Sequence, residues 1–66
     1  MTDYYETEAR IVAATSMALL CDIDGEEFWI PKSLLSEEGE VSGHSDVGEI
    51  GMIMIPEWFA IKEEII

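Results

Sequence analysis

The chain has 66 residues, 48% of them hydrophobic, and a net charge of −12 at pH 7, which predicts one small folded domain rather than a disordered segment. Its 15 acidic residues outnumber the three basic ones, Arg10, Lys32 and Lys62, so no basic stripe is present that could follow a phosphate backbone. This charge excludes direct binding to duplex DNA or anionic membranes and favours a basic protein surface as the partner. Solubility alone would also explain it.

Compartment signals are few. Cys21 is the only cysteine, so no disulfide can form within the chain, and a reducing compartment is the simpler expectation. The first ten residues, MTDYYETEAR, have neither the basic start nor the apolar core of a signal peptide. No apolar run reaches the length of a membrane helix. We therefore expect a cytoplasmic protein.

The first half of the chain reads as strands. Residues 1–7 are polar and are expected to be a lead-in to a single domain over residues 8–66. From Ala9 the run ARIVAA predicts a strand, and Thr15-Ser16 predicts a turn. Residues 17–23 alternate with period two, which predicts a second strand. One face of this strand carries Met17, Leu19, Cys21 and Ile23.

Asp24-Gly25 is a strong hairpin signal, because both residues tolerate the positive φ of a type I′ turn. A two-residue loop determines the register of the strands that it joins. The expected cross-strand pairs are Ile23 with Glu26, Asp22 with Glu27, Cys21 with Phe28, Leu20 with Trp29, and Leu19 with Ile30. Phe28 therefore faces the core, whereas Trp29 points to the opposite face.

Pro31 lacks a backbone N–H and should end the third strand or place it at an edge. Residues 32–35 predict a short turn or one helical turn. The segment 36–47, SEEGEVSGHSDV, is expected to be a flexible acidic loop. Residues 48–55, GEIGMIMI, predict a fourth strand that is apolar on both faces and is therefore central or covered.

The last segment, PEWFAIKEEII, predicts a helix over residues 56–66, with Pro56 at its first position and Glu57 in its first turn. A helix this short must dock on the sheet or on another subunit. The elements together predict a mainly β fold, a small antiparallel SH3-like meander barrel of β-β-β-loop-β type with a short C-terminal helix as its cap. The large apolar side chains of strand and helix exceed what one small barrel hides, which favours a homodimer. They are Met52, Ile53, Met54, Trp58 and Phe59.

The sequence contains no catalytic motif. His44 lies in a loop without positioned neighbours, and Cys21 is expected to be a small buried hydrophobe. The acids around the hairpin turn do not have the spacing of a Ca²⁺ loop. We therefore expect a protein that is not an enzyme and binds no cofactor or metal.

The run DIDGEEFWIPKSLL, preceded by ATSMALL and followed later by PEWFAIKE, resembles small uncharacterised proteins of bacteriophages and prophages. These share a DGxxxWIPKSxL core and a C-terminal PEW segment, and the likeness covers residues 10–63. It implies a phage product in the host cytoplasm that acts on host machinery, including defence systems. In that setting a very acidic protein is similar to inhibitors that mimic the phosphate charge of DNA. The resemblance implies no residue-level active site.

The main hypothesis is a non-enzymatic, anti-CRISPR-like inhibitor that docks on a basic surface of a host nucleic-acid-handling or defence complex. Its expected partner-binding residues are Asp22, Glu26, Glu27, Trp29, Glu37, Glu38 and Glu40. The alternative is an oligomeric barrel that binds a nucleotide or single-stranded nucleic acid, in which Trp29 stacks on a base and Lys32 and Ser33 meet a phosphate. A phage assembly accessory is a third possibility. In a purely structural interpretation, the C-terminal helix covers Trp29.

Overall fold

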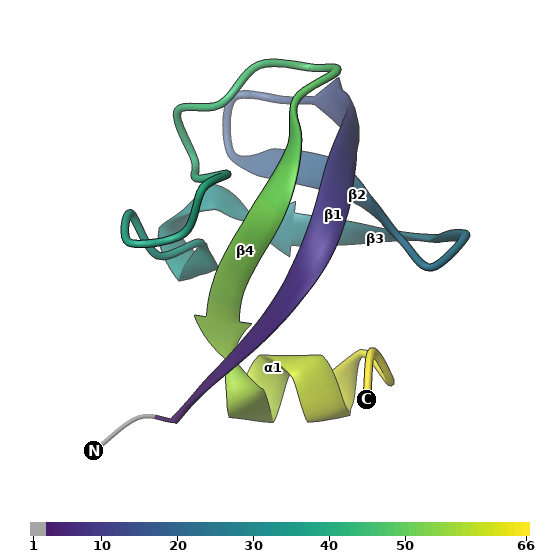
Figure 1. Cartoon of the computed structure of the whole chain (residues 1–66), viewed down its shortest axis with the longest axis vertical. Helices are drawn as coiled ribbons and strands as arrows, with labels where there is room; N and C mark the ends of the chain where they lie inside the picture. The colour runs from purple at the N-terminus through teal and green to yellow at the C-terminus, as the bar shows by residue number, and fades with distance from the viewer. Residues whose placement is uncertain (1–2) are drawn as a thin grey trace.

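A computed structural model describes residues 3–66 and shows a mainly β fold with a short C-terminal helix (Figure 1). The four strands form one antiparallel sheet in the order β3-β2-β1-β4. Within residues 3–66 no ladder joins β3 to β4, so closure of the expected barrel is not confirmed. The elements are β1 (Tyr4–Ala14), β2 (Ala18–Ile23), β3 (Glu26–Pro31), the 3₁₀ helix η1 (Lys32–Leu34), β4 (Ile50–Pro56) and α1 (Glu57–Lys62).

The long strand β1 belongs to both halves of the curved sheet. Residues 4–10 pair with β4, and residues 10–14 pair with β2. A β-bulge between Ile11 and Ala13 shifts the register where the two halves meet, and bulges bend a strand and increase its twist. In Figure 1, β3 runs behind β1 and β4 and across their direction.

The strand β1 starts earlier than the sequence suggested. Tyr4 already pairs with Pro56, so residues 4–7 are part of the sheet and the expected polar lead-in is wrong for them. Residues 1–2 lie outside the described part of the chain. Polar residues in this segment alternate with residues that point inward. The segment becomes a strand because it pairs with β4, which is far away in the sequence.

The β2–β3 hairpin confirms the expected register at all five pairs. Asp24 has φ 53° and Gly25 has φ 87°, as a type I′ turn requires. Met17 was expected to share the inner face of the strand, but β2 begins only at Ala18, and Met17 is 77% exposed. It belongs to the preceding turn, in which the Thr15 hydroxyl accepts a hydrogen bond from the Ala18 N–H at 3.0 Å.

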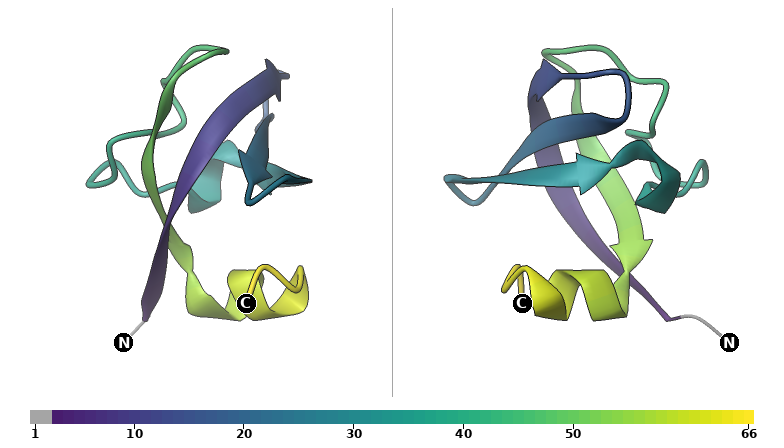
Figure 2. Two further views of the ribbon diagram at one scale, coloured as in Figure 1. Left: turned by 45° about the vertical axis from the view of Figure 1, so that its right-hand side comes forward. Right: turned by 180° about the vertical axis from the view of Figure 1, so that it is seen from behind.

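The core lies between the two halves of the sheet, with α1 at one end (Figure 2). Inward residues alternate along every strand, as expected for sheets with one solvated face. Leu35 and Val41, which both follow β3 in the chain, complete this core. Its buried members are Ala9, Ile11, Leu19, Cys21, Ile23, Ile30, Leu35, Val41, Ile53, Ile55, Phe59 and Ala60.

The helix α1 is shorter than expected, because the chain turns back after Lys62. Glu64 has φ 60°, its N–H donates to Ile61 O at 3.1 Å, and Ile65 N–H donates to Ala60 O at 2.8 Å. This is a Schellman ending, and it lets Ile65 pack against the core. In the described part of the chain, no helix is both long and apolar enough to cross a membrane.

The segment between η1 and β4 runs along the outer edge of β4. Ser36 N–H donates to Met54 O at 2.9 Å, and Val41 N–H donates to Met52 O at 3.1 Å. The strand β4 begins at Ile50 rather than at Gly48. Of the two expected situations for this strand, central or covered, the structure shows a covered edge.

Candidate functional site

The outer face of the β2–β3 hairpin carries an exposed tryptophan among acids. Trp29 is 49% exposed and lies opposite the half-buried Leu20. The helix α1 packs against β1 and β4 and leaves Trp29 open to solvent, so the expectation that α1 covers Trp29 is wrong. We call Leu20, Asp22, Glu27 and Trp29 the hairpin surface. Glu26 pairs with the buried Ile23 and therefore belongs to the other face of the hairpin.

Asp22 and Glu27 face each other across this hairpin, an arrangement of like charges that costs some tenths of a kcal/mol. The structure shows what offsets the repulsion. Arg10 lies opposite Asp22 on the other side, and its Nη2 is 3.5 Å from Asp22 Oδ2. The sequence did not indicate this ion pair, because it depends on the bulged register between β1 and β2.

The seven expected partner-binding residues fall into two groups. Asp22, Glu27 and Trp29 belong to the hairpin surface, Glu26 lies on the other face of the same hairpin, and the remaining three are in the segment beside β4. These two places lie on opposite sides of the molecule in Figure 1. The structure therefore does not bring the seven residues together. The group beside β4 has no aromatic side chain and consists of Glu37, Glu38 and Glu40.

Glu40 has a structural contact of its own. Its Oε1 accepts a hydrogen bond of 2.8 Å from Met52 N–H, on the outer edge of β4. Gly51 makes room for it, since a Cβ at this position would lie 2.9 Å from Glu40 Cβ. Glu40 thus caps the outer edge of β4, because it accepts from the Met52 N–H, which would otherwise bond to water.

We expect Glu40→Ala to lower the free energy of unfolding by about 1 kcal/mol, because it removes a charged acceptor from a backbone N–H. Glu38→Ala is the matched control, since no hydrogen bond or ion pair of the Glu38 side chain is present among residues 3–66. Urea unfolding of both variants measures the difference. Equal stability of the two variants would contradict a capping role.

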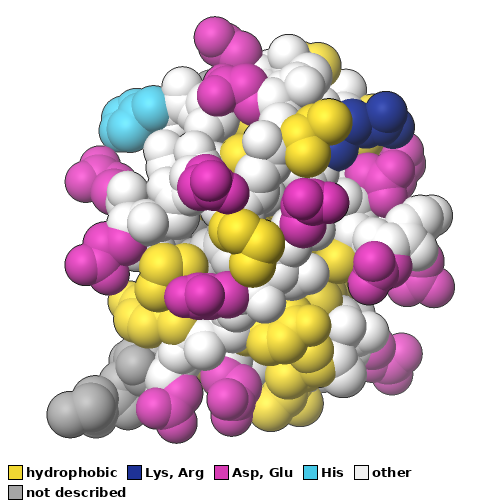
Figure 3. Space-filling view, viewed as in Figure 1, with side chains coloured by type: hydrophobic (Ala, Val, Ile, Leu, Met, Phe, Trp, Pro, Cys, Tyr) yellow, Lys and Arg dark blue, Asp and Glu magenta, His cyan; other side chains and the backbone are white. Residues whose placement is uncertain are grey.

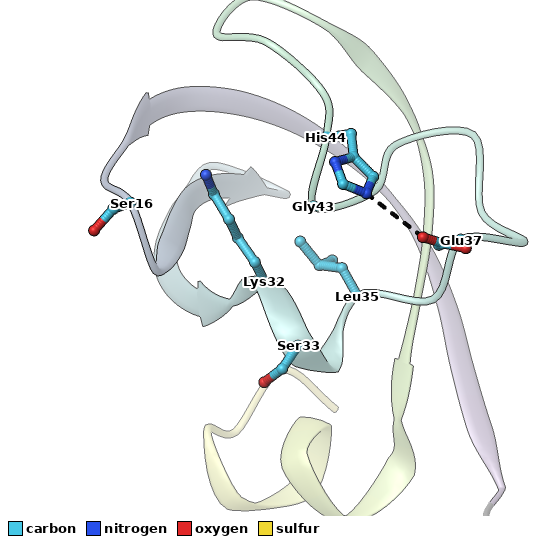
Figure 4. A pocket seen from close by; sticks show the side chains of 7 residues that line it. All are labelled: Ser16, Lys32, Ser33, Leu35, Glu37, Gly43 and His44. Atoms are coloured by element: carbon cyan, nitrogen blue, oxygen red, sulfur yellow. Dashed lines mark ion pairs between the residues drawn. The ribbon is translucent and has the colours of Figure 1, made fainter.

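A second place of interest is an open depression of about 420 Å³ where η1 meets the loop (Figure 4). Lys32 and Ser33, the expected phosphate-binding pair, both line it, but Trp29 does not. Gly43 lets the loop approach Lys32, because a Cβ there would lie 3.1 Å from Lys32 Cβ. The full lining is Ser16, Lys32, Ser33, Leu35, Glu37, Gly43 and His44.

His44 lies at the rim of this depression. Its Nε2 is 3.5 Å from Glu37 Oε1, and both side chains are more than four-fifths exposed, at 86% and 82%. An ion pair this exposed is weak. No sequence signal brings these two residues together, because their approach depends on the path of the loop.

The charge of the molecule lies on its surface. All 15 acidic residues of the chain are among residues 3–66, and none of them is buried. Acidic side chains are spread over the face shown in Figure 3, with hydrophobic side chains between them. Among residues 3–66, Arg10 with Asp22 is the single ion pair between an Arg or Lys side chain and a carboxylate.

Metal-binding or nucleophilic groups are not assembled in the described structure. Among residues 3–66 no group of three or more His, Cys, Asp or Glu side chains could hold a metal ion. Cys21 is fully buried, and desolvation raises the pKa of its thiol to about 11. A thiol in this state is a poor nucleophile.

Comparisons of the chain with protein-family models, with curated proteins and with solved structures found no match.

Proposed function

We propose that this protein is a non-enzymatic binding protein whose hairpin surface docks on a basic, nucleic-acid-binding surface of another protein. The observation that carries the proposal is Trp29, half exposed on a regular strand and flanked by the carboxylates of Asp22 and Glu27. An exposed tryptophan is a typical hot-spot anchor, and acids around it steer a basic partner toward it. The partner that fits this chemistry is a host nucleic-acid-handling or defence complex in the cytoplasm, which the protein would inhibit.

The surface charge supports the same proposal. With no acid buried and a net charge of −12, the protein presents carboxylates where a nucleic acid presents phosphates. A site that binds phosphates through Lys and Arg would attract such a surface, and salt would weaken the complex. Competition with DNA is therefore the natural signature of this activity.

We expect Trp29→Ala to weaken partner binding by about 2 kcal/mol, or roughly thirtyfold, because hot-spot anchors contribute this much. Trp58→Ala is the matched control: Trp58 is 54% exposed, but it lies on α1 and packs edge-on against Phe59. Both variants and the wild type are immobilised and incubated with bacterial lysate at about 50 and about 200 mM salt, and bound proteins are identified by mass spectrometry.

The proposal predicts one or more nucleic-acid-binding proteins that the wild type and Trp58→Ala retain at low salt and that Trp29→Ala loses. Added duplex DNA should displace them. Capture of the same proteins by all three forms, or of proteins that DNA does not displace, would contradict it.

A second candidate function is supported by the depression at η1. Lys32 lines it without a carboxylate within ion-pair distance among residues 3–66, together with Ser16 and Ser33. Figure 4 shows the ammonium group of Lys32 and the hydroxyls of Ser16 and Ser33 pointing in different directions, so Lys32 alone would meet the phosphate of a small ligand. Stacking on Trp29, as the sequence suggested, does not belong to the same site, since Trp29 is not part of the lining. A rise in melting temperature with a nucleotide, abolished by Lys32→Ala, would favour this function.

A further inference from the structure

The two edges of the sheet differ. The outer edge of β4 is covered by the segment that follows η1, through Ser36, Val41 and the carboxylate of Glu40. The strand β3 is the other edge of the sheet. Among residues 3–66, the hydrogen bonds outside regular strands and helices include none from the backbone of Glu27 or Trp29. An uncovered edge strand is a template for a further strand.

The hairpin register determines which backbone groups of β3 point outward. Lys32 N–H donates to Met17 O at 2.9 Å at the open end of the hairpin. Hydrogen-bonded and non-hydrogen-bonded pairs alternate along an antiparallel ladder, and the β2–β3 register has no irregularity. Phe28 and Ile30 therefore bond to β2, whereas Glu27 and Trp29 direct their N–H and C=O groups away from it. Pro31, two residues after Trp29, also directs its backbone away from β2. Its missing N–H therefore removes no hydrogen bond of the β2–β3 ladder.

The position of β3 leaves this edge accessible near the hairpin turn. In Figure 2 (right), β2 runs above β3 and α1 lies below it, on the side of the free edge, while the hairpin turn projects past the end of α1. Glu26 and Glu27, the first two residues of the strand, are exposed. The side chain of Trp29, on the same face as Glu27, adds apolar contact area beside the edge.

The charge around the outer edge of β3 indicates which kind of strand could add to it. Asp22, Asp24, Glu26 and Glu27 surround it, and no basic residue lies between Arg10 and Lys32. A second copy of the chain would bring a like set of acids against this one, and charges on an edge strand are a known defence against such pairing. Lysine or arginine side chains on an added strand would instead form cross-strand pairs of opposite charge, and arginine would also stack on Trp29.

We infer that β3 accepts an extended, basic segment of the partner protein as an additional strand, by backbone hydrogen bonds to Glu27 and Trp29. Strand addition of this kind obtains affinity from the main chain and specificity from alternate side chains. Basic side chains of the segment lie on the outer face beside Glu27 and Trp29, and apolar ones lie beside the half-buried Phe28. The inference rests on the proposed function, because it describes how the hairpin surface holds its partner.

The test uses a short peptide of alternating lysine and valine, blocked at both ends, and the full ¹⁵N-labelled chain. In an antiparallel added strand, the lysine residues opposite Glu27 and Trp29 direct their own N–H groups toward β3. A peptide with N-methylated lysine nitrogens keeps every charge but cannot donate these bonds. A peptide with N-methylated valine nitrogens is the matched control, because its methyl groups point away from β3.

We expect the unmodified and valine-methylated peptides to bind and to slow hydrogen exchange of the Glu27 and Trp29 amides at least tenfold. The Phe28 amide, already bonded to β2, should change little. The lysine-methylated peptide should bind at least tenfold more weakly. On the protein, Glu27→Pro should lose the protection at Trp29, whereas Glu27→Ala, which loses the same charge but keeps the N–H, should retain it. The amide spectrum of each variant reports whether it is folded.

Equal binding of both methylated peptides, with the Glu27 and Trp29 amides unprotected, would overturn strand addition. If that binding were still lost in Trp29→Ala, the proposed side-chain contact would stand without the added strand. Protection of these amides that rises with protein concentration alone, together with dimers in sedimentation, would show that a second copy occupies the edge and would also overturn the inference. Failure of every peptide to bind would overturn it as well, while lysate capture tests the proposed function separately.

Discussion

Leu19→Ala is expected to lower the free energy of unfolding by roughly 2–5 kcal/mol, the range for truncating a fully buried leucine. Leu19 has no exposed surface and packs in the core between the two halves of the sheet. A 66-residue domain has a total stability of roughly 3–10 kcal/mol, so this single change removes a large part of it. Urea unfolding followed by tryptophan fluorescence and circular dichroism measures the loss.

Leu20→Ala is the matched control, because it makes the same chemical change one residue along the same strand. Leu20 is half-buried on the outer face, opposite Trp29, and its truncation should cost about 1 kcal/mol or less. A shift of register by one residue would exchange the two faces of β2. Equal costs for the two variants would therefore contradict the register of the hairpin.

The Cys21 thiol is expected to react about a hundredfold more slowly with a disulfide reagent at pH 8 in the folded protein than in urea. Burial raises its pKa from 9.0 to about 11, which lowers the thiolate fraction at this pH by about that factor, and only the thiolate reacts. The reaction is followed by absorbance of the released thiol. A folded protein that reacted as fast as the unfolded chain would show that Cys21 is accessible.

The same burial predicts a dependence of stability on pH. The folded pKa of about 11 lies above the unfolded value of 9.0, so the neutral thiol is favoured by folding. This contribution is fully present below pH 9 and is lost as the pH rises through 11, about 3 kcal/mol in total. Cys21→Ala is the control: the difference in unfolding free energy between wild type and variant should shrink between pH 9 and 11.

Much of the hairpin could be predicted from the sequence, because its information is local. Asp24-Gly25 determines a two-residue turn, the turn determines the register, and the alternation of side chains then assigns each face. The prediction that Phe28 faces inward and Trp29 outward required nothing from the rest of the chain, and the structure confirms it. The one-turn segment after Pro31 is confirmed as η1 for the same reason.

The candidate site was only partly predictable. The exposure of Trp29 depends on where α1 packs, and this is decided by contacts of Phe59 and Ala60 with a core built from the whole chain. Grouping the acids of the hairpin with Glu37, Glu38 and Glu40 failed because their positions depend on the path of the segment beside β4. The depression around Lys32 likewise depends on the close approach of Gly43, eleven residues further along the chain.

By itself, the sequence determined the features whose signals lie within a few residues. These are the hairpin, the mainly β class, the acidic surface and the alternation of side chains that places Trp29 on the outer face. Only the tertiary structure decided that residues 4–7 extend β1 and that Glu40 caps β4. It also decided that, within residues 3–66, no other strand pairs with the outer edge of β3. The physical reason is the range of the interactions. Turn geometry and side-chain alternation act between neighbours, whereas strand pairing, edge capping and helix docking join residues that meet only when the chain folds.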